Sequence, residues 1–229
     1  MSGMLLRMDK HDFEAGVGVL CALPQELGSL VAPDWRRIEV QGIRMAQGEI
    51  AGCPVWASCV GVGKVAAAHG AALLLAQGVG QLMVVGTCGG LQAALQPGNM
   101  VHCEVAIQAD LALREGRLSR ADPALLERWR SAAPGPLATF LSADRPVLNP
   151  WHRRRLRRAW PGTSVADMET AAAAAVAARA QIPWAALRTV TDRAGLGAGA
   201  AFRRNFESMA GLAADTLHRV LSRGSQTVD

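Results

Sequence analysis

The sequence has no tyrosine, few aromatic residues and few cysteines. Aromatic residues make up 4% of the 229 residues, and the five cysteines include no Cys-x-x-Cys pair. An odd set of this kind fits buried thiols in a reducing compartment better than a disulfide framework. No apolar run is long enough to cross a bilayer, and the first residues lack the basic start and apolar core of a secretory signal. We therefore predict a cytoplasmic protein that folds without disulfides. We also expect that it uses neither a metal nor a cofactor.

Charged residues are also scarce, and one run holds much of the positive excess. They make up 19% of the chain, with a net charge of +5, and five arginines lie between Arg153 and Arg158. Such a run is usually the solvated face of a helix, and the alternative is contact with phosphates or an anionic membrane. Because no RNA-binding motif surrounds it, we expect no nucleic-acid partner and keep peripheral membrane contact through Arg153 to Arg158 as the alternative.

The order of apolar segments predicts an α/β fold. Short runs rich in Val and Ile alternate with helical stretches rich in Ala and Leu, as expected for strands buried on both faces. Expected strands are 17–22, 43–49, 54–60, 81–86, 99–107, 137–142 and 184–190, and expected helices are 24–31, 64–76, 123–131, 151–160, 167–180 and 202–223. We predict one domain over 1–229, with 1–15 loosely ordered and 224–229 a tail.

Three carboxylates stand where predicted strands end or predicted helices begin, the places at which α/β proteins bind ligands. Glu26 follows the first strand, Asp167-Met168-Glu169 opens an alanine-rich helix, and Thr191-Asp192 closes the strand after that helix. Acidic residues also favour helix starts because of the helix dipole, so position alone does not indicate catalysis. Paired carboxylates from adjacent elements are, however, the usual equipment for acid-base chemistry on a glycosidic bond.

Two glycine-rich segments lie directly after predicted strands. Gly61-Val62-Gly63-Lys64 lacks the first glycine and the spacing of a P-loop, so we do not expect a nucleoside triphosphate there. Gly86-Thr87-Cys88-Gly89-Gly90 is expected to form a loop whose amides and hydroxyl can meet a small ligand. Tight packing is the alternative explanation for the glycines of both segments.

Taken in order, these motifs make the chain resemble the nucleoside phosphorylase superfamily. The resemblance is strongest to bacterial nucleosidases that hydrolyse methylthioadenosine and adenosylhomocysteine, and it covers most of the chain. The residues that carry it are Ala22-Leu23-Pro24-Gln25-Glu26, Gly61-Val62-Gly63-Lys64, Gly86-Thr87-Cys88-Gly89-Gly90, Pro97-Gly98-Asn99, Asp167-Met168-Glu169 and Arg188-Thr189-Val190-Thr191-Asp192. The resemblance implies a three-layer α/β/α sandwich with a mixed, partly barrel-like sheet, assembled as a homodimer or a larger homo-oligomer.

The resemblance also implies roles for individual residues in cleaving the bond between a purine and a ribose. Asp192 would protonate the purine, Glu169 would bind the ribose hydroxyls, and Glu26 would activate water. The expected substrate-binding positions are Thr87 near that water, Cys88, Gly89 against the base, Val147 with its backbone on adenine, Met168 beside the ribose, and Thr191.

Departures from the family pattern leave the exact reaction open. Pro146 stands where the nucleosidases have an aromatic residue against the base, and Met83-Val84-Val85 lacks the arginine that phosphorylases use for phosphate. The second departure favours water, with phosphate kept as an alternative co-substrate. The middle of the chain also resembles hopanoid-associated phosphorylases, which act on adenosylhopane.

The remaining alternatives concern the pocket and turnover. We expect apolar residues such as Leu23 and Phe206 to line the pocket for the 5′ group. His102 and Arg193 flank the expected site in the sequence without an assigned role. A non-catalytic nucleoside-binding or membrane-associated protein of the same fold is the alternative to an enzyme.

Overall fold

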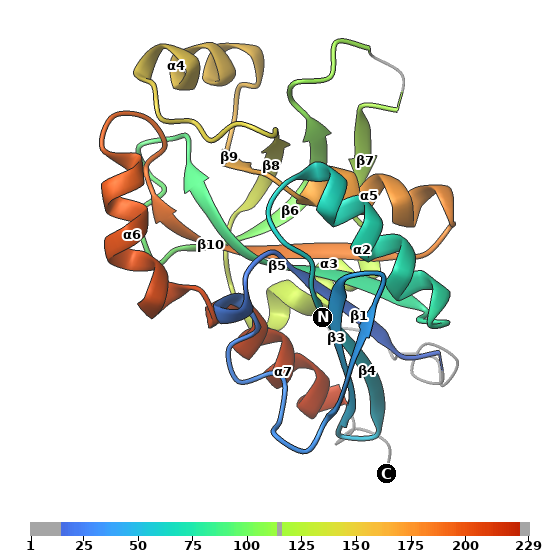
Figure 1. The fold of residues 1–229 in the computed structure, drawn as a ribbon. Helices are drawn as coiled ribbons and strands as arrows, with labels where there is room; N and C mark the ends of the chain where they lie inside the picture. Colours follow the sequence, from blue (N-terminus) through green and yellow to red (C-terminus); the bar gives the residue numbers. More distant parts are fainter. Residues whose placement is uncertain (1–14, 114–115, 225–229) are drawn as a thin grey trace, which may run out of the picture.

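The computed structural model describes residues 15–113 and 116–224 (Figure 1). The expected loosely ordered start and the expected tail therefore lie outside the described residues, except for Ala15 and Gly224, the last residue of a helix.

The described strands form one mixed sheet, part of which closes into a barrel. They are β1 (Val17–Cys21), β2 (Arg36–Val40), β3 (Ile43–Ile50), β4 (Cys53–Cys59), β5 (Gln81–Gly90), β6 (Met100–Gln108), β7 (Leu118–Arg120), β8 (Leu137–Ser142), β9 (Ser164–Asp167) and β10 (Trp184–Asp192). The order is β10-β6-β8-β9-β5-β1-β4-β3-β2, with β7 on β6. Because β10 also pairs with β5, the strands β5, β10, β6, β8 and β9 form a closed ring. The predicted fold class, with its mixed and partly barrel-like sheet, is confirmed.

Helices cover both faces of this sheet (Figure 1). They are the 3-10 helix η1 (Pro24–Leu27), α2 (Lys64–Ala76), α3 (Pro123–Ala132), α4 (Pro150–Ala159), α5 (Thr170–Arg179), α6 (Ala198–Met209) and α7 (Leu212–Gly224). Along β5, Leu82 and Val84 pack in the core with α2 and α5, whereas Met83 and Val85 pack in the core with α3 and α7. Successive side chains of a strand point to opposite faces, so a continuous apolar run builds both cores.

Several boundaries differ from the sequence-based expectations. The expected glycine loop after residue 86 belongs to β5, because Gly89 and Gly90 pair with β9. The helix expected over 24–31 is only the short η1, which ends at Leu27 and is followed by Gly28 with a φ of 51°. The helix expected from residue 167 begins at Thr170, since Asp167 ends β9 and its carboxylate accepts a hydrogen bond from the Thr170 amide.

The expected closing helix over 202–223 is divided into α6 and α7. A Cβ at Gly211, between them, would lie 2.8 Å from the Gly28 Cα. At this turn the backbone of Gly211 packs directly against that of Gly28, an approach that a side chain on Gly211 would block. The short strands β2, β7 and β9 were not expected: β2 carries exposed arginines, and β7 and β9 have only three and four residues.

Candidate active site

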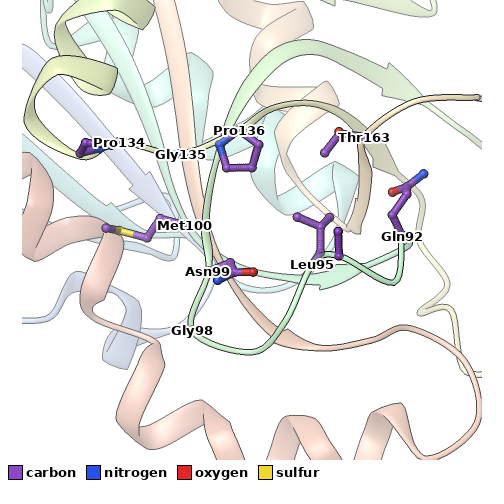
Figure 2. A pocket seen from close by; sticks show the side chains of 10 residues that line it. Gln92, Leu95, Gly98, Asn99, Met100, Pro134, Gly135, Pro136 and Thr163 are labelled. Atoms are coloured by element: carbon purple, nitrogen blue, oxygen red, sulfur yellow. The ribbon is translucent and has the colours of Figure 1, made fainter.

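A cavity of about 990 Å³ opens at the ends of β1, β5, β9 and β10 and contains several charged residues. A second cavity of about 500 Å³, shown in Figure 2, lies near Asn99, Met100 and the Pro134-Gly135-Pro136 segment. No titratable side chain is found among the described residues that line the second cavity. Pockets with a few converging polar groups are the usual sites of binding and catalysis, so the larger cavity is the candidate active site.

The three predicted carboxylates all line the larger cavity. Glu26 comes from η1 after β1, Glu169 precedes α5, and Asp192 is the last residue of β10. Each side chain is buried, with residue exposures of 2%, 4% and 8%. The structure thus brings together residues that lie more than 160 positions apart in the sequence.

Glu26 is held by four donors at the end of β1. Its Oε2 accepts hydrogen bonds from the amides of Ala22 and Leu23, each at 3.0 Å. Its Oε1 accepts from the Thr87 amide at 2.8 Å and from the Thr87 hydroxyl at 2.9 Å. A carboxylate has about four lone-pair positions, so all of them are occupied, and the Thr87 hydroxyl is the donor that can rotate away.

Arg188 is a buried cation to which the sequence analysis gave no role. Its Nε lies 2.9 Å from Asp167, its Nη2 lies 3.0 Å from Glu169, and its Nη1 donates to the Thr87 carbonyl at 2.8 Å. Burial acts to lower the pKa of Arg188, but Asp167 and Glu169 outweigh it and raise that pKa above its ordinary value. An arginine in the middle of a fully buried strand was the signal that could have identified it.

Glu169 joins Arg188 to the glycine-rich start of α2. Its Oε1 accepts a hydrogen bond from the Gly63 amide at 3.0 Å. Burial raises the pKa of Glu169, and Arg188 opposes that rise. The next amide, that of Lys64, donates to Asp144 at 2.8 Å. Backbone amides of the segment from Gly61 to Lys64 therefore bind carboxylates of the protein itself. This contact gives the glycine-rich segment a role other than binding a phosphate as a P-loop does.

No positively charged group contributes to the pKa shift of Asp192. Burial raises the pKa of this carboxyl, while the Ala194 amide, at 2.8 Å from Oδ1, and the Thr191 hydroxyl, at 3.0 Å from Oδ2, act to lower it. The Thr191 hydroxyl also lies 3.3 Å from the Cys88 carbonyl. A hydroxyl has one proton, so if it donates to Cys88 it can accept from a protonated Asp192. The positions of Thr191 and Asp192 therefore allow a hydrogen bond that stabilises the protonated form of Asp192.

The other predicted positions also line this cavity: Thr87, Cys88, Gly89, Val147, Met168 and Thr191. Burial raises the pKa of the Cys88 thiol well above its ordinary value, so this side chain is a neutral wall rather than a nucleophile. The Val147 carbonyl already accepts a hydrogen bond from the Gly195 amide at 2.6 Å.

Four further residues were expected at or beside the site, namely Leu23, Phe206, His102 and Arg193. Leu23 lines the cavity as expected. The aromatic residue of α6 that lines the cavity is Phe202, not Phe206. Phe206 is buried, with its ring centroid 4.9 Å from that of Phe202. Helical spacing places the two rings on one face of α6, and the sequence did not show which one reaches the cavity. His102 does not line the cavity but lies on β6, with its Nε2 2.7 Å from the Ala133 carbonyl. Arg193 is exposed.

Replacing Gly86 by alanine is expected to separate Glu26 from Arg188. A Cβ at Gly86 would lie 2.8 Å from Glu26 Oε1 and 3.0 Å from Arg188 Nη1, and both side chains are buried. Overpacking of this kind costs about 1–3 kcal/mol. Thermal unfolding should therefore show a larger loss for Gly86→Ala than for Gly42→Ala, where φ is also positive but no atom lies within 4 Å. Equal losses would contradict the steric explanation.

In the parts of the chain that the structure describes, no group of three His, Cys, Asp or Glu residues could hold a metal ion, and no helix is long and apolar enough to cross a membrane.

Comparison with known proteins identifies the family. Residues 16–223 match the model of the phosphorylase superfamily. A 5'-methylthioadenosine/S-adenosylhomocysteine nucleosidase of Mycobacterium bovis is 29% identical over 90% of this chain and 96% of that protein. The Neisseria meningitidis nucleosidase in complex with methylthio-immucillin-A has a TM-score of 0.86 at 22% identity, covering 91% of this chain and 99% of that one.

A second solved structure has a different name. Futalosine hydrolase of Helicobacter pylori also has a TM-score of 0.86, at 19% identity, covering 92% of this chain and 99% of that one. Structural likeness at such low identity shows the shared fold alone. The family model, in contrast, matches almost the whole chain. The protein belongs to the phosphorylase superfamily.

Proposed function

We propose that this protein is a purine nucleosidase that cleaves the N-glycosidic bond of an adenine nucleoside with water. The observation that carries the proposal is the meeting of Glu26, Glu169 and Asp192 in one cavity, in which Asp192 has a raised pKa. The named relatives, which are nucleosidases of methylthioadenosine and adenosylhomocysteine, support the same reaction.

Asp192 is proposed as the general acid. A purine leaves readily only as a neutral base, so a proton must reach its ring as the bond breaks. The raised pKa of Asp192 keeps that proton available closer to neutral pH than an ordinary carboxyl would. The Ala194 amide and the Thr191 hydroxyl fix the carboxyl in one orientation.

Glu169 is proposed to bind the ribose hydroxyls, with Met168 beside the sugar. As the base leaves, the ribose becomes a cation of the oxocarbenium type, and a nearby carboxylate stabilises it. The bonds from Gly63 and Arg188 position Glu169 before the substrate arrives. Such preorganisation avoids reorganisation during the reaction.

Glu26 is proposed to activate the attacking water. To accept the water's proton, this carboxylate must first lose one of its four donors, and the Thr87 hydroxyl is the donor attached to a side chain that can rotate. Thr87 then serves as the hydroxyl that holds the water beside Glu26. This sequence of events gives both residues a defined part in one step.

Charge favours water over phosphate as the nucleophile. Arg188 lines the cavity, but its charge is already compensated by Asp167 and Glu169, and Glu26 adds a further negative charge nearby. A phosphate dianion placed directly beside Arg188, Glu169 and Glu26 would meet more negative than positive charge. Phosphorolysis, with phosphate as a co-substrate, is the alternative reaction.

The base is proposed to lie between Gly89 and the backbone of Val147, with Cys88 closing the wall. Phe202, from α6, is an aromatic side chain in the cavity, whereas Pro146 is exposed at its edge. The 5′ substituent is proposed to be that of methylthioadenosine or adenosylhomocysteine, and adenosylhopane is the alternative substrate. A cavity of about 990 Å³ leaves room for a large substituent.

We also propose a cytoplasmic homo-oligomer. All five cysteines are free, which suits a reducing compartment. Val62, which lines the cavity just before α2, and Val65, in the first turn of α2, are 52% and 81% exposed. A second copy of the chain would cover this apolar surface.

The proposal is tested by measuring adenine release from methylthioadenosine, adenosylhomocysteine, adenosine and adenosylhopane, each with and without phosphate. We expect release without phosphate, with a sugar product that keeps its 5′ substituent and carries a free hydroxyl at C1. Release that requires phosphate and yields the corresponding sugar 1-phosphate would overturn hydrolysis in favour of phosphorolysis. Nucleoside binding without release, unchanged in Glu26→Gln, would support the non-catalytic alternative, for which the replacement of an expected aromatic residue by Pro146 is the motivating observation.

A further inference from the structure

The segments 145–163 and 193–206, which contribute part of the cavity's lining, carry nine arginines and no acidic residue. The arginines of this basic rim are Arg145, Arg153, Arg154, Arg155, Arg157, Arg158, Arg193, Arg203 and Arg204. Since the net charge of the whole chain is +5, the rest of the chain sums to 5 − 9 = −4. In the ion pairs of the described residues, none of the nine has a carboxylate partner. The basic rim therefore carries nine arginines without an ion-pair partner among the described residues, and Asp144, Asp192 and Glu207 border its two segments.

Helix α4 turns one face to the protein and another to solvent. Leu156 is buried, Trp160 is half-buried, and Arg153 donates to the Leu91 carbonyl at 2.9 Å, so these residues fix the helix in place. Residues 151, 154, 155 and 158 are spaced by three or four and are all exposed. This spacing places Trp151 on the same outward face as three arginines.

Trp151 stands among other exposed apolar side chains. It is 75% exposed, and Leu148 and Leu196 are 53% and 90% exposed. The chain segments that carry them adjoin: a Cβ at Gly195, next to Leu196, would lie 3.9 Å from Pro150, next to Trp151, and a Cβ at Gly199 would lie 4.0 Å from Leu148 Cδ2. Apolar side chains of this size gathered at a surface mark a site of interaction.

The basic rim adjoins one side of the active-site cavity. Leu148, Arg155 and Arg203 belong to the rim and line the large cavity as well. In Figure 1, α4 lies at the top of the molecule, at the opposite end from the β3–β4 hairpin. Whatever covers the rim therefore faces the mouth of the cavity.

We infer that the basic rim docks the enzyme onto an anionic lipid bilayer, with Trp151, Leu148 and Leu196 entering the headgroup region. Arginines attract the negative surface of such a bilayer, and tryptophan and leucine bury their apolar parts at the interface. A nucleic acid would match the charge but would leave the two leucines without an apolar partner. A second copy of the chain would bring nine arginines against nine others. This inference goes beyond the proposed function, because it concerns a surface that the cleavage of a soluble nucleoside does not require.

The first test is sedimentation of the full chain with vesicles of equal parts phosphatidylcholine and phosphatidylglycerol. We expect binding that is lost with vesicles of phosphatidylcholine alone and that weakens at high salt. Arg154→Glu with Arg158→Glu should weaken it by at least about tenfold. Arg36→Glu with Arg44→Glu, the same charge change on β2 and β3, should leave it nearly intact. Equal weakening by the two pairs of substitutions would overturn the docking surface.

The second test uses tryptophan fluorescence with brominated lipids, which quench only nearby rings. Of the six tryptophans, Trp151 is the exposed one. We expect quenching on anionic vesicles that disappears in Trp151→Phe while sedimentation persists. Binding without quenching, preference for DNA over vesicles, or a stable dimer that protects Trp151 would each overturn the inference. Because Arg154, Arg158 and Trp151 do not line the cavity, adenine release from a soluble nucleoside should be unchanged in these variants, so failure of docking is distinguishable from failure of the proposed reaction.

Discussion

Asp192→Asn is expected to lower the rate of adenine release by about 10²–10⁴-fold. The asparagine side chain can accept from the Ala194 amide and donate to the Thr191 hydroxyl, as a protonated Asp192 would. It cannot transfer a proton to the base. The variant therefore keeps the shape of the acid form and loses its chemistry.

The same substitution is expected to stabilise the folded protein at neutral pH. The pKa of Asp192 is raised above its ordinary value of 3.8, mainly by burial. The folded state therefore holds a proton that the unfolded state has released, and stability falls as pH rises from 3.8 through the raised pKa. Asparagine does not ionise, so the gain in thermal unfolding temperature should be present at neutral pH and absent below pH 3.8.

Two measurements check this prediction, namely the rate of adenine release as a function of pH and thermal unfolding at several pH values. The wild-type rate should fall as pH rises through the raised pKa of Asp192, because the acid form is lost. Asp34→Asn, at an exposed carboxylate outside the cavity, is the matched control and should change neither property. If Asp192→Asn retains about a tenth or more of the wild-type rate, the loss is smaller than the removal of a general acid produces, and Asp192 is excluded from that role.

The sequence allowed the convergence of Glu26 and Asp192 to be predicted, because the ends of neighbouring strands meet at one edge of a sheet, whereas Glu169 was expected there only from the predicted helix start. Glu26 follows β1 and Asp192 ends β10, and both strands pair with β5. Their long apolar runs made these strands easy to recognise. The catalytic and binding roles themselves remain proposals.

Other features could not be read from local patterns. The partners of Arg188 come from β5, β9 and the start of α5, so they exist only once the barrel closes. The strand β9 has four residues, which is too short for an alternating pattern to stand out. The break between α6 and α7 depends on contact of Gly211 with Gly28, which lies more than 180 residues away. These features depend on long-range contacts that no short window of sequence contains.

Arg188→Met is expected to produce the largest loss of stability. The substitution keeps an unbranched chain as far as the position of the arginine Nε but leaves Asp167 and Glu169 without their buried cation. Breaking a buried ion pair by removing one partner costs about 3–5 kcal/mol. For a chain of this size, this loss corresponds to a decrease of roughly 10 °C in the unfolding temperature. Arg36→Met, on the exposed face of β2, should lower it by a degree or less.

The cause of this loss can be separated from a simple packing defect. Arg188 lowers the pKa of Glu169, so its removal allows that pKa to rise further, and the folded variant then binds more protons than the unfolded chain. The deficit should therefore shrink as pH falls through the raised pKa. Adding Glu169→Gln should also recover part of the loss, because one uncompensated charge is then absent. A deficit that is independent of pH and unchanged in the double variant would instead assign it to the lost volume of the side chain, and Arg188 would then not be the charge that holds Glu169 in place.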